Sequence, residues 1–256
     1  MNQIKAHAKV NIFLKITGHH NGYHTLLSRF ALVDNLYDTI TLTPQKCDRF
    51  VIEGCDGIAT SSNTIYKAYQ ALLEATQSLE LEQFFREHKV VVTKEIPSLA
   101  GLGGGSSDGA AFMRLVNTLC TLGLSIQELS RIGSSIGADL PFFIHNYSSA
   151  NVKGFGEIVE EFTEEPLHIE TMTPAIGCDT TLVYKTFKKE FLSKIDTNSF
   201  DGWEEKGSKE ILEEIQNPLL LNDLYLSARE LYPNLEEYAQ DGWYFSGSGS
   251  SFFRVL

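Results

Sequence analysis

A run of four glycines and two serines, Gly101-Leu-Gly-Gly-Gly-Ser-Ser107, constrains this chain more than any other segment. Residues 89–95 before it have the apolar pattern of a strand, and the residues after it have the pattern of an amphipathic helix. Glycines let the backbone approach a ligand closely, and successive amides with a helix N-terminus attract anions. The hydroxyls of Ser106 and Ser107 add polar groups at the same place. We therefore predict a loop that binds phosphate, the alternative being a flexible turn.

The familiar phosphate-binding patterns do not fit this run. A P-loop needs Lys followed by Ser or Thr after its last glycine, and Ser106-Ser107-Asp108 stands there instead. A Rossmann loop needs a third Gly or Ala at Ser106 and a strand after the helix. A capping box, Ser125-Ile-Gln-Glu128, follows here and predicts another helix. The glycine run therefore fits neither of these two patterns.

The rest of the chain predicts an α+β protein with two lobes and a boundary near residue 150. Residues 8–16 alternate as a half-buried strand, with Lys9 and Asn11 on the side away from the main core. The other expected segments are a turn over 17–24, extended segments over 26–33, 38–43 and 50–53, a helix from the Ser62-Asn63 cap to about 75, strands between 150 and 175, a polar loop over 193–209, helices over 209–240 and a final strand, turn and strand over 242–256.

Composition narrows the class of protein. The chain has 256 residues and a net charge of −12, which argues against binding nucleic acid through a basic surface. Its four cysteines lack the spacing of a zinc or redox motif, so we expect reduced thiols. The sequence shows neither a signal peptide nor an apolar run long enough to cross a membrane. We expect a cytoplasmic protein without a membrane or nucleic-acid partner.

Two charged residues are candidates for phosphoryl-transfer chemistry, which needs cations near the developing charge and often a carboxylate base. Asp139 is the carboxylate of choice, because Gly137 and Pro141 fix the backbone around it. Lys9 is the candidate cation. Taken alone, Asp139 is better explained as a turn residue that bonds nearby amides, and Lys9 as a solvated strand lysine.

Three motifs taken in order resemble the GHMP small-molecule kinases, the family of galactose, homoserine, mevalonate and phosphomevalonate kinases. They are Ala8-Lys-Val-Asn-Ile-Phe-Leu14, Pro97-Ser-Leu-Ala-Gly-Leu-Gly-Gly-Gly-Ser-Ser107 and Phe245-Ser-Gly-Ser-Gly-Ser-Ser251. The resemblance implies a two-lobed fold with the active site in the cleft between the lobes, and ATP and Mg²⁺ as cofactors. It implies an ATP-binding lobe over residues 1–150 and a substrate-binding lobe over 151–256, shortened at its end.

Within this family the segment Asn21-Gly-Tyr-His-Thr-Leu26 is similar to members whose acceptor is a cytidine-diphosphate-linked methylerythritol, in the non-mevalonate isoprenoid pathway. Gly137-Ala-Asp-Leu-Pro-Phe-Phe143 and Lys153-Gly-Phe-Gly-Glu157 resemble their later signatures. The resemblance implies that Asp139 takes the proton of the C2 hydroxyl, helped by Lys9. It also implies that Asn11 binds the methylerythritol hydroxyls. The residues implied to recognise cytosine are Tyr23, His24 and Tyr184.

The same resemblance implies a set of ATP-binding residues and no protein ligand for the metal. The set is Asn63, Lys94, Pro97, Leu99, Gly101, Gly103, Gly104, Gly105, Ser106 and Ser107. His19, His20 and His24 could instead suggest zinc, but further ligands have no obvious source. A homoserine or mevalonate type of kinase and a nucleotide-binding protein without activity stay open as alternatives. We expect a monomer or a weak homodimer.

Overall fold

The computed structural model describes residues 2–20, 23–196 and 199–256, and the side chain of Tyr23 lies outside this description. The chain forms two compact units. The first consists of Met1–Ala8, Asn35–Ile96 and Gly104–Asn146, and the second of Lys9–Asp34, Pro97–Gly103 and Tyr147–Leu256. The predicted boundary near residue 150 is close to the last of these divisions. The units are nevertheless not two continuous segments, because the long strands β1 and β2 contribute residues to both.

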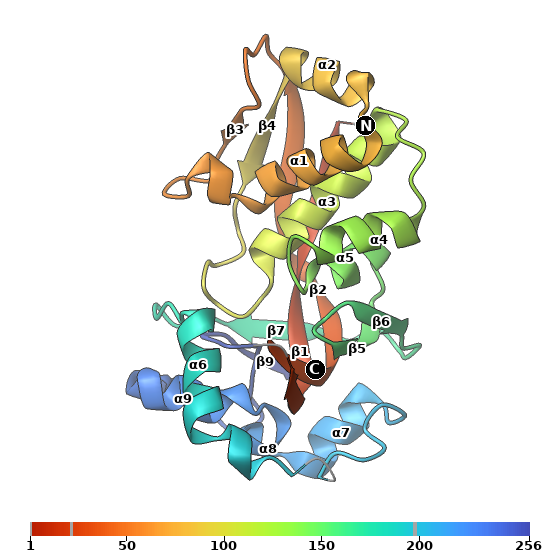
Figure 1. Ribbon diagram of the computed structural model, residues 1–256. Helices are drawn as coiled ribbons and strands as arrows, with labels where there is room; N and C mark the ends of the chain where they lie inside the picture. Colours follow the sequence, from red (N-terminus) through yellow and green to blue (C-terminus); the bar gives the residue numbers. More distant parts are fainter. Residues whose placement is uncertain (1, 21–22, 197–198) are drawn as a thin grey trace. The chain divides into compact units, whose positions relative to one another are not determined.

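Along the first unit the strands β1 to β3 come first, and β4 then lies between two groups of helices (Figure 1). Its elements are β1 (Gln3–His20) and β2 (Tyr23–Pro44), both shared with the second unit, then β3 (Ile52–Glu53), η1 (Thr60–Ser62), α1 (Thr64–Thr76), α2 (Leu79–Glu87), β4 (His88–Thr93), α3 (Gly104–Leu119), α4 (Ile126–Ser134) and α5 (Leu140–His145).

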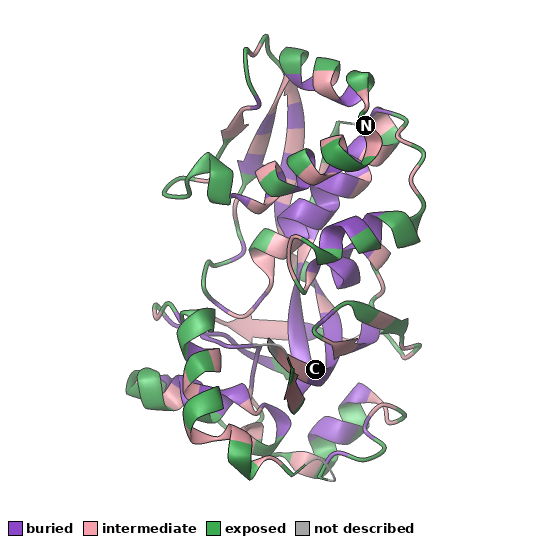
Figure 2. Cartoon of the chain, viewed as in Figure 1, coloured by how far each residue is buried: buried purple, intermediate pink, exposed green. Residues whose placement is uncertain are grey.

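The sheet of the first unit is built on β4. This strand pairs antiparallel with residues 39–44 of β2 and parallel with β3. Helix α3 packs against α1 and α5, and its buried residues lie on several sides of the helix (Figure 2). An aromatic cluster fills the space next to it, where Phe50 stacks on Tyr69 with 4.2 Å between ring centroids and Phe85 contacts both rings. Such all-round burial fixes the helix that begins in the glycine run.

The second unit combines two antiparallel arrangements of strands. Residues 26–31 of β2 pair with β5, which pairs with β6, and β9 lies between β7 and β8. Its further elements are β5 (Ser149–Gly154), β6 (Ile158–Glu161), β7 (Ile169–Met172), α6 (Thr180–Glu190), η2 (Leu192–Lys194), α7 (Ser208–Ile215), α8 (Pro218–Leu221), α9 (Leu224–Leu231), η3 (Pro233–Tyr238), β8 (Tyr244–Phe245) and β9 (Phe252–Val255).

Arg29 on β2 organises the irregular segment before α7. Its guanidinium is fully buried and donates to Asn151 Oδ1 at 2.7 Å and to the carbonyls of Trp203, Glu204 and Lys206. Burial lowers the pKa of Arg29 to about 10, against the opposing charges of nearby carboxylates. A buried guanidinium is stable only when its donors are matched with acceptors. Arg29 therefore holds in place the polar stretch for which the sequence predicts a loop.

The predicted α+β class is confirmed, and several element predictions need correction. Strands predicted over 26–33 and 38–43 form one strand, β2, because the chain continues through Asp34–Tyr37 without turning. Helices α2, α5 and α6 were not predicted. The strand over 8–16 is buried on both faces rather than half-buried, since Phe13 packs against Trp203 and Lys9 lies over Phe30. The capping box at Ser125 is confirmed.

None of the helices within the described residues is long and apolar enough to cross a membrane.

Candidate functional site: a nucleotide loop and an acceptor cluster

Helix α3 begins inside the glycine run, at Gly104, so its first N–H groups come from Gly104, Gly105 and Ser106. Close packing explains the glycine at position 104. A Cβ on Gly104 would lie 3.0 Å from the Ile96 side chain and 3.6 Å from Lys94 Nζ. The free amides of a helix N-terminus, next to a cation, make a site that favours phosphate.

The first part of the predicted phosphate loop belongs to the second unit, where the two glycine motifs contact each other. Gly101 has a φ of +73°, and a Cβ there would lie 2.2 Å from the carbonyl oxygen of Ser246. Ser246 Oγ donates to the Gly101 carbonyl at 3.0 Å, and the Ser251 N–H donates to the Ala100 carbonyl at 3.0 Å. Only glycine fits this close approach of backbones. The turn over 245–251 therefore braces residues 97–103.

Asn222 and Thr180 support the same C-terminal turn. The side-chain amide of Asn222 donates to the carbonyls of Phe245 and Gly247, at 3.0 and 2.9 Å. Thr180 Oγ1 lies 2.8 Å from Ser248 Oγ. These contacts leave the turn with few alternative conformations.

Lys94 lies at the centre of a buried ionic network in the first unit. Its Nζ donates to Asp38 Oδ2 and, at 2.7 Å, to Asp108 Oδ2. Burial lowers the pKa of Lys94, but the charges and hydrogen bonds of Asp108 and Asp38 outweigh this effect and raise it. Lys94 is thus a fixed cation beside Gly104, as an ATP-binding role requires.

Lys9 and Asn11 form a buried polar pair on β1 in the second unit. Lys9 Nζ donates to Asn11 Oδ1 at 2.5 Å, and Asn11 Nδ2 donates to Ser28 Oγ at 2.9 Å. Lys9 is 4% exposed and Asn11 is 1% exposed. The prediction that both side chains share one side of the strand is confirmed, whereas the prediction that this side faces away from the core is wrong. A buried ammonium next to an amide points to chemistry with a polar ligand.

Rings gather around His24, at the start of β2. The His24 ring centroid lies 5.4 Å from that of Tyr184, 5.8 Å from that of Phe187 and 5.1 Å from that of His19. The pKa of His24 is lowered by burial first and then by the charges of His19 and Lys188. The structure therefore brings the rings of His24 and Tyr184 together. Tyr23 is half of the same motif, but its side chain lies outside the described residues, as do Asn21 and Gly22.

Asp139 occupies the N-cap position of α5 in the first unit and is partly exposed. Its side chain makes no capping hydrogen bond to this helix. Gly137 lies close to the phosphate loop, since a Cβ on it would be 3.8 Å from Ser106 Oγ. The turn that carries Asp139 therefore adjoins the start of α3 within one unit.

The other predicted ATP-binding residues differ in their exposure and in the hydrogen bonds that they make within the fold. Asn63 is the N-cap of α1, and its Oδ1 accepts from the Ile65 N–H at 2.8 Å. Ser107 is buried, and its hydroxyl donates to the His7 carbonyl at 2.7 Å. Pro97 and Leu99 are exposed, and Leu99 has a left-handed φ of +54°. Asn63 and Ser107 thus have bonds within the fold that their predicted role did not include.

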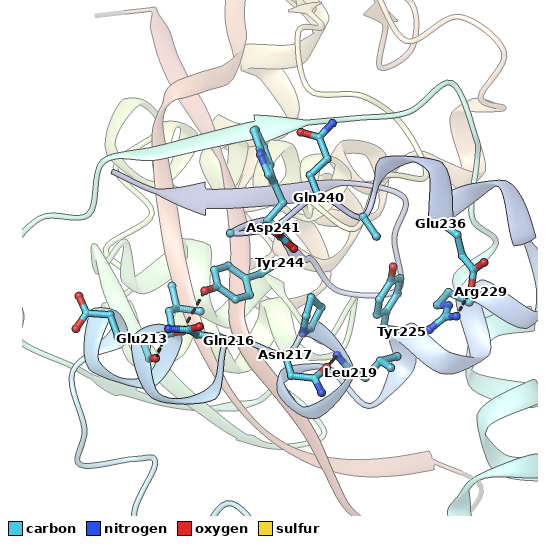
Figure 3. A pocket seen from close by; sticks show the side chains of 15 residues that line it. Glu213, Gln216, Asn217, Leu219, Tyr225, Arg229, Glu236, Gln240, Asp241 and Tyr244 are labelled. Carbon is cyan, nitrogen blue, oxygen red and sulfur yellow. Dashed lines mark hydrogen bonds and ion pairs between the residues drawn. The ribbon is translucent and has the colours of Figure 1, made fainter.

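A separate cavity of about 750 Å³ lies in the second unit (Figure 3). Tyr225, Trp243 and Tyr244 line it together with the ion pair of Arg229 and Glu236. The Tyr225 ring stacks on Phe245, 4.5 Å between centroids. None of the predicted site residues lines this cavity, so we do not assign it to the nucleotide or the acceptor.

Sequence reasoning missed Asp38, Asp108, Ser28 and Asn222, and it did not predict the ring contact of His19 with His24. Asp108 directly follows the serine pair of the phosphate loop, which was an available signal. Asp38 and Asn222 reach their partners 56 and 25 residues away, and nothing in the local pattern indicates such a contact. In the described part of the chain, no group of three or more His, Cys, Asp or Glu residues could hold a metal ion.

Comparison with known proteins identifies the family and the fold. Residues 63–147, which contain the start of α3 and Asp139, match the model of the GHMP kinases N terminal domain. A crystal structure of 4-(cytidine 5'-diphospho)-2C-methyl-D-erythritol kinase is similar with a TM-score of 0.74 and 26% identity, covering 99% of this chain and 90% of that one. The fold and the glycine motifs define a GHMP kinase.

Two curated relatives are similar over their whole length. The 4-diphosphocytidyl-2-C-methyl-D-erythritol kinase of Sulfurovum sp. (strain NBC37-1) is 61% identical over 255 residues, which cover 100% of this chain and 99% of that protein. That of Sulfurimonas denitrificans is 45% identical, covering 100% and 97%. The chain belongs to the family of 4-diphosphocytidyl-2-C-methyl-D-erythritol kinases.

Proposed function

We propose that this protein transfers the γ-phosphoryl group of ATP to the C2 hydroxyl of 4-diphosphocytidyl-2-C-methyl-D-erythritol. The observation that carries the proposal is the 61% identity, over the whole chain, with the 4-diphosphocytidyl-2-C-methyl-D-erythritol kinase of Sulfurovum sp.. The residues proposed to bind the acceptor support it, because Lys9 and Asn11 form one buried polar pair and His24 contacts Tyr184. The reaction belongs to isoprenoid synthesis by the non-mevalonate route.

The nucleotide binds at the start of α3 in this proposal. The amides of Gly104, Gly105 and Ser106 bind phosphate oxygens, and Lys94 adds a positive charge. Asn63, Pro97, Leu99, Gly101, Gly103 and Ser107 complete the proposed ATP site. Mg²⁺ would be held mainly by phosphate oxygens and water, which suits an ion that rarely takes an all-protein cage. When bound, it neutralises charge on the phosphates.

The acceptor is bound by the second set of residues. Neutral His24 hydrogen-bonds the edge of the cytosine, Tyr23 and Tyr184 provide aromatic faces, and Asn11 binds the methylerythritol hydroxyls. Asp139 accepts the proton of the C2 hydroxyl, and Lys9 stabilises the negative charge that develops in transfer. Each role matches the chemistry of its side chain.

The remaining expectations are part of the same proposal. The protein acts on a small molecule in the cytoplasm, as a monomer or weak homodimer, without nucleic acid or membrane. Gel filtration at micromolar concentration tests the oligomeric state.

A coupled assay of ADP release tests the activity. It compares the cytidyl substrate, homoserine, mevalonate and no acceptor, each with ATP and Mg²⁺. We expect turnover only with the cytidyl substrate. Equal turnover of homoserine would make the protein another kind of GHMP kinase, and nucleotide binding without turnover of any acceptor would make it a non-catalytic nucleotide-binding protein.

A further inference from the structure

Two carboxylates share one ammonium group at the nucleotide loop. Lys94, just after β4, bonds both Asp38 from β2 and Asp108 from α3, and all three residues belong to the first unit. Asp38 is 0% exposed and Asp108 is 4% exposed, so water does not screen them. Neither carboxylate is one of the residues of the proposed ATP site.

The two carboxylates differ in how many hydrogen-bond donors their oxygens have. Asp38 Oδ1 accepts from the backbone N–H groups of Glu95 and Ile96, at 2.6 and 2.9 Å, and its Oδ2 accepts from Lys94. Asp108 accepts from Lys94 through Oδ2, but its buried Oδ1 has no hydrogen-bond donor among the described residues. An unsatisfied buried carboxylate oxygen is costly, and a proton on this group removes most of that cost.

Lys94 is placed where it can touch a bound phosphate. Its Nζ is 3.6 Å from the position of a Cβ on Gly104, the first residue of α3, and its side chain is 28% exposed. An ammonium has three N–H groups, and two of them are used by Asp38 and Asp108. The third is available to an oxygen of the nucleotide. Asp108 lies on the first turns of the same helix, so it couples the cation to the loop.

We propose that Asp108 is a positioning residue for the nucleotide: with Asp38 it fixes the Lys94 ammonium beside Gly104, and it takes up a proton when the phosphates bind. The proposal rests on the nucleotide site described under the proposed function. It adds a role for a residue that acts through Lys94.

Charge balance gives the direction of the effect. With Asp108 ionised, Lys94, Asp38 and Asp108 together carry one negative charge, which repels the phosphates. With Asp108 protonated they are neutral, so nucleotide binding and protonation favour each other by linkage. Burial raises the pKa of Asp108 to about 7, with Lys94 opposing this rise and Asp38 adding to it. The Cys55 thiol also interacts electrostatically with Asp108, Lys94 and Asp38, and burial raises the pKa of this thiol.

The test measures the Kd of a nonhydrolysable ATP analogue, without acceptor, from pH 6 to pH 8.5. For the wild-type protein we expect the Kd to rise by about tenfold as Asp108 ionises, the effect of one charge at close range. Asp108→Asn keeps an acceptor for Lys94 but cannot ionise, so its Kd stays low and changes with pH only as the analogue itself titrates. Asp108→Ala removes the anchor and weakens binding at every pH.

Glu95→Gln is the matched control, because Glu95 is an exposed neighbour of Lys94 and its variant should follow the wild-type profile. Titration of the analogue itself is common to all variants and cancels in the comparison. Identical pH profiles for the wild type and Asp108→Asn overturn the proposal.

A second measurement needs no variant and holds even if Asp108→Asn does not fold. Calorimetry at pH 7 in buffers of different ionisation enthalpy gives the number of protons bound with the analogue. We expect net proton uptake beyond that of the analogue, and its absence overturns the proposal. If the analogue binds as expected but no acceptor is phosphorylated, the proposed function fails while the role of Asp108 stands.

Discussion

Lys9 Nζ donates a hydrogen bond of 2.5 Å to Asn11 Oδ1, so two alternate positions of one strand form a single buried polar pair. The amide of Asn11 is held in turn by Ser28 on β2. This bonding fixes the orientation of the ammonium before any ligand arrives. The ammonium is therefore preorganised, so it can stabilise negative charge in a transition state without first having to reorient.

Replacing Lys9 with Met tests its charge while keeping its length. We expect kcat to fall by about 10²–10³-fold, the usual effect of losing a preorganised charge, with the KM for ATP little changed. Lys5→Met is the control, because Lys5 lies exposed on the same strand. Steady-state kinetics and thermal unfolding are measured for both. A kcat within about threefold of wild type would remove Lys9 from the chemistry.

Replacing Asp139 with Asn tests the proposed base. We expect kcat to fall by about 10²–10⁴-fold, because the amide cannot accept the proton of the hydroxyl. The KM values of both substrates should stay near wild type. Asp34→Asn, at an exposed position of β2, is the control. A loss below about tenfold would mean that Asp139 orients the hydroxyl, since phosphoryl transfer can need little proton abstraction.

Gly101→Ala should destabilise the second unit by more than about 2 kcal/mol, from a left-handed backbone and a clash with the Ser246 carbonyl. Gly57→Ala separates the two causes, because Gly57 has a φ of +82° and a Cβ added there would meet nothing within 4 Å. This control should lose only about 1 kcal/mol. Denaturant unfolding measures both variants. Equal losses would contradict the argument from close approach.

His24 makes the stability of the fold sensitive to acid. Its pKa is lowered in the folded state, so the unfolded chain binds a proton more readily as the pH falls below about 6.5. The free energy of unfolding should therefore decrease from pH 7.5 to pH 5.5, and less steeply in His24→Gln. His145, whose pKa burial also lowers, accounts for part of the remaining slope.

His20→Gln is the control for this experiment, because His20 is exposed at the end of β1. It should keep the wild-type slope. If His24→Gln and the wild type lose the same free energy over this pH range, burial of the imidazole has no role in the acid sensitivity.

Local chemistry explains what the sequence could predict. The glycine run, the Ser125 capping box and the alternation around Lys9 act over a few residues, and each produced the expected element. The pairing of His24 with Tyr184 followed from family motifs, not from spacing, since 160 residues separate them. Motif resemblance therefore supplied the parts of the site that local patterns could not.

Long-range packing explains what the sequence could not predict. Alternation on β1 indicated one exposed face, but Trp203 and Phe30 cover that face, and their positions depend on the whole fold. In the sequence pattern Asp38 is an ordinary strand residue. Its hydrogen bonds with Lys94 and with the backbone N–H groups of Glu95 and Ile96 form only in the folded protein. Tertiary contacts of this kind override local preference.

The interleaving of the two units has a consequence for synthesis on the ribosome. Residues 9–34 emerge early, but their partners in the second unit come mostly from residues 147–256. At about 5–20 residues per second, on the order of ten seconds pass before those partners are made. The apolar strand around Ile12 and Phe13 is exposed during this interval. Nascent chains halted before residue 147 should therefore be captured by chaperones that bind extended apolar segments.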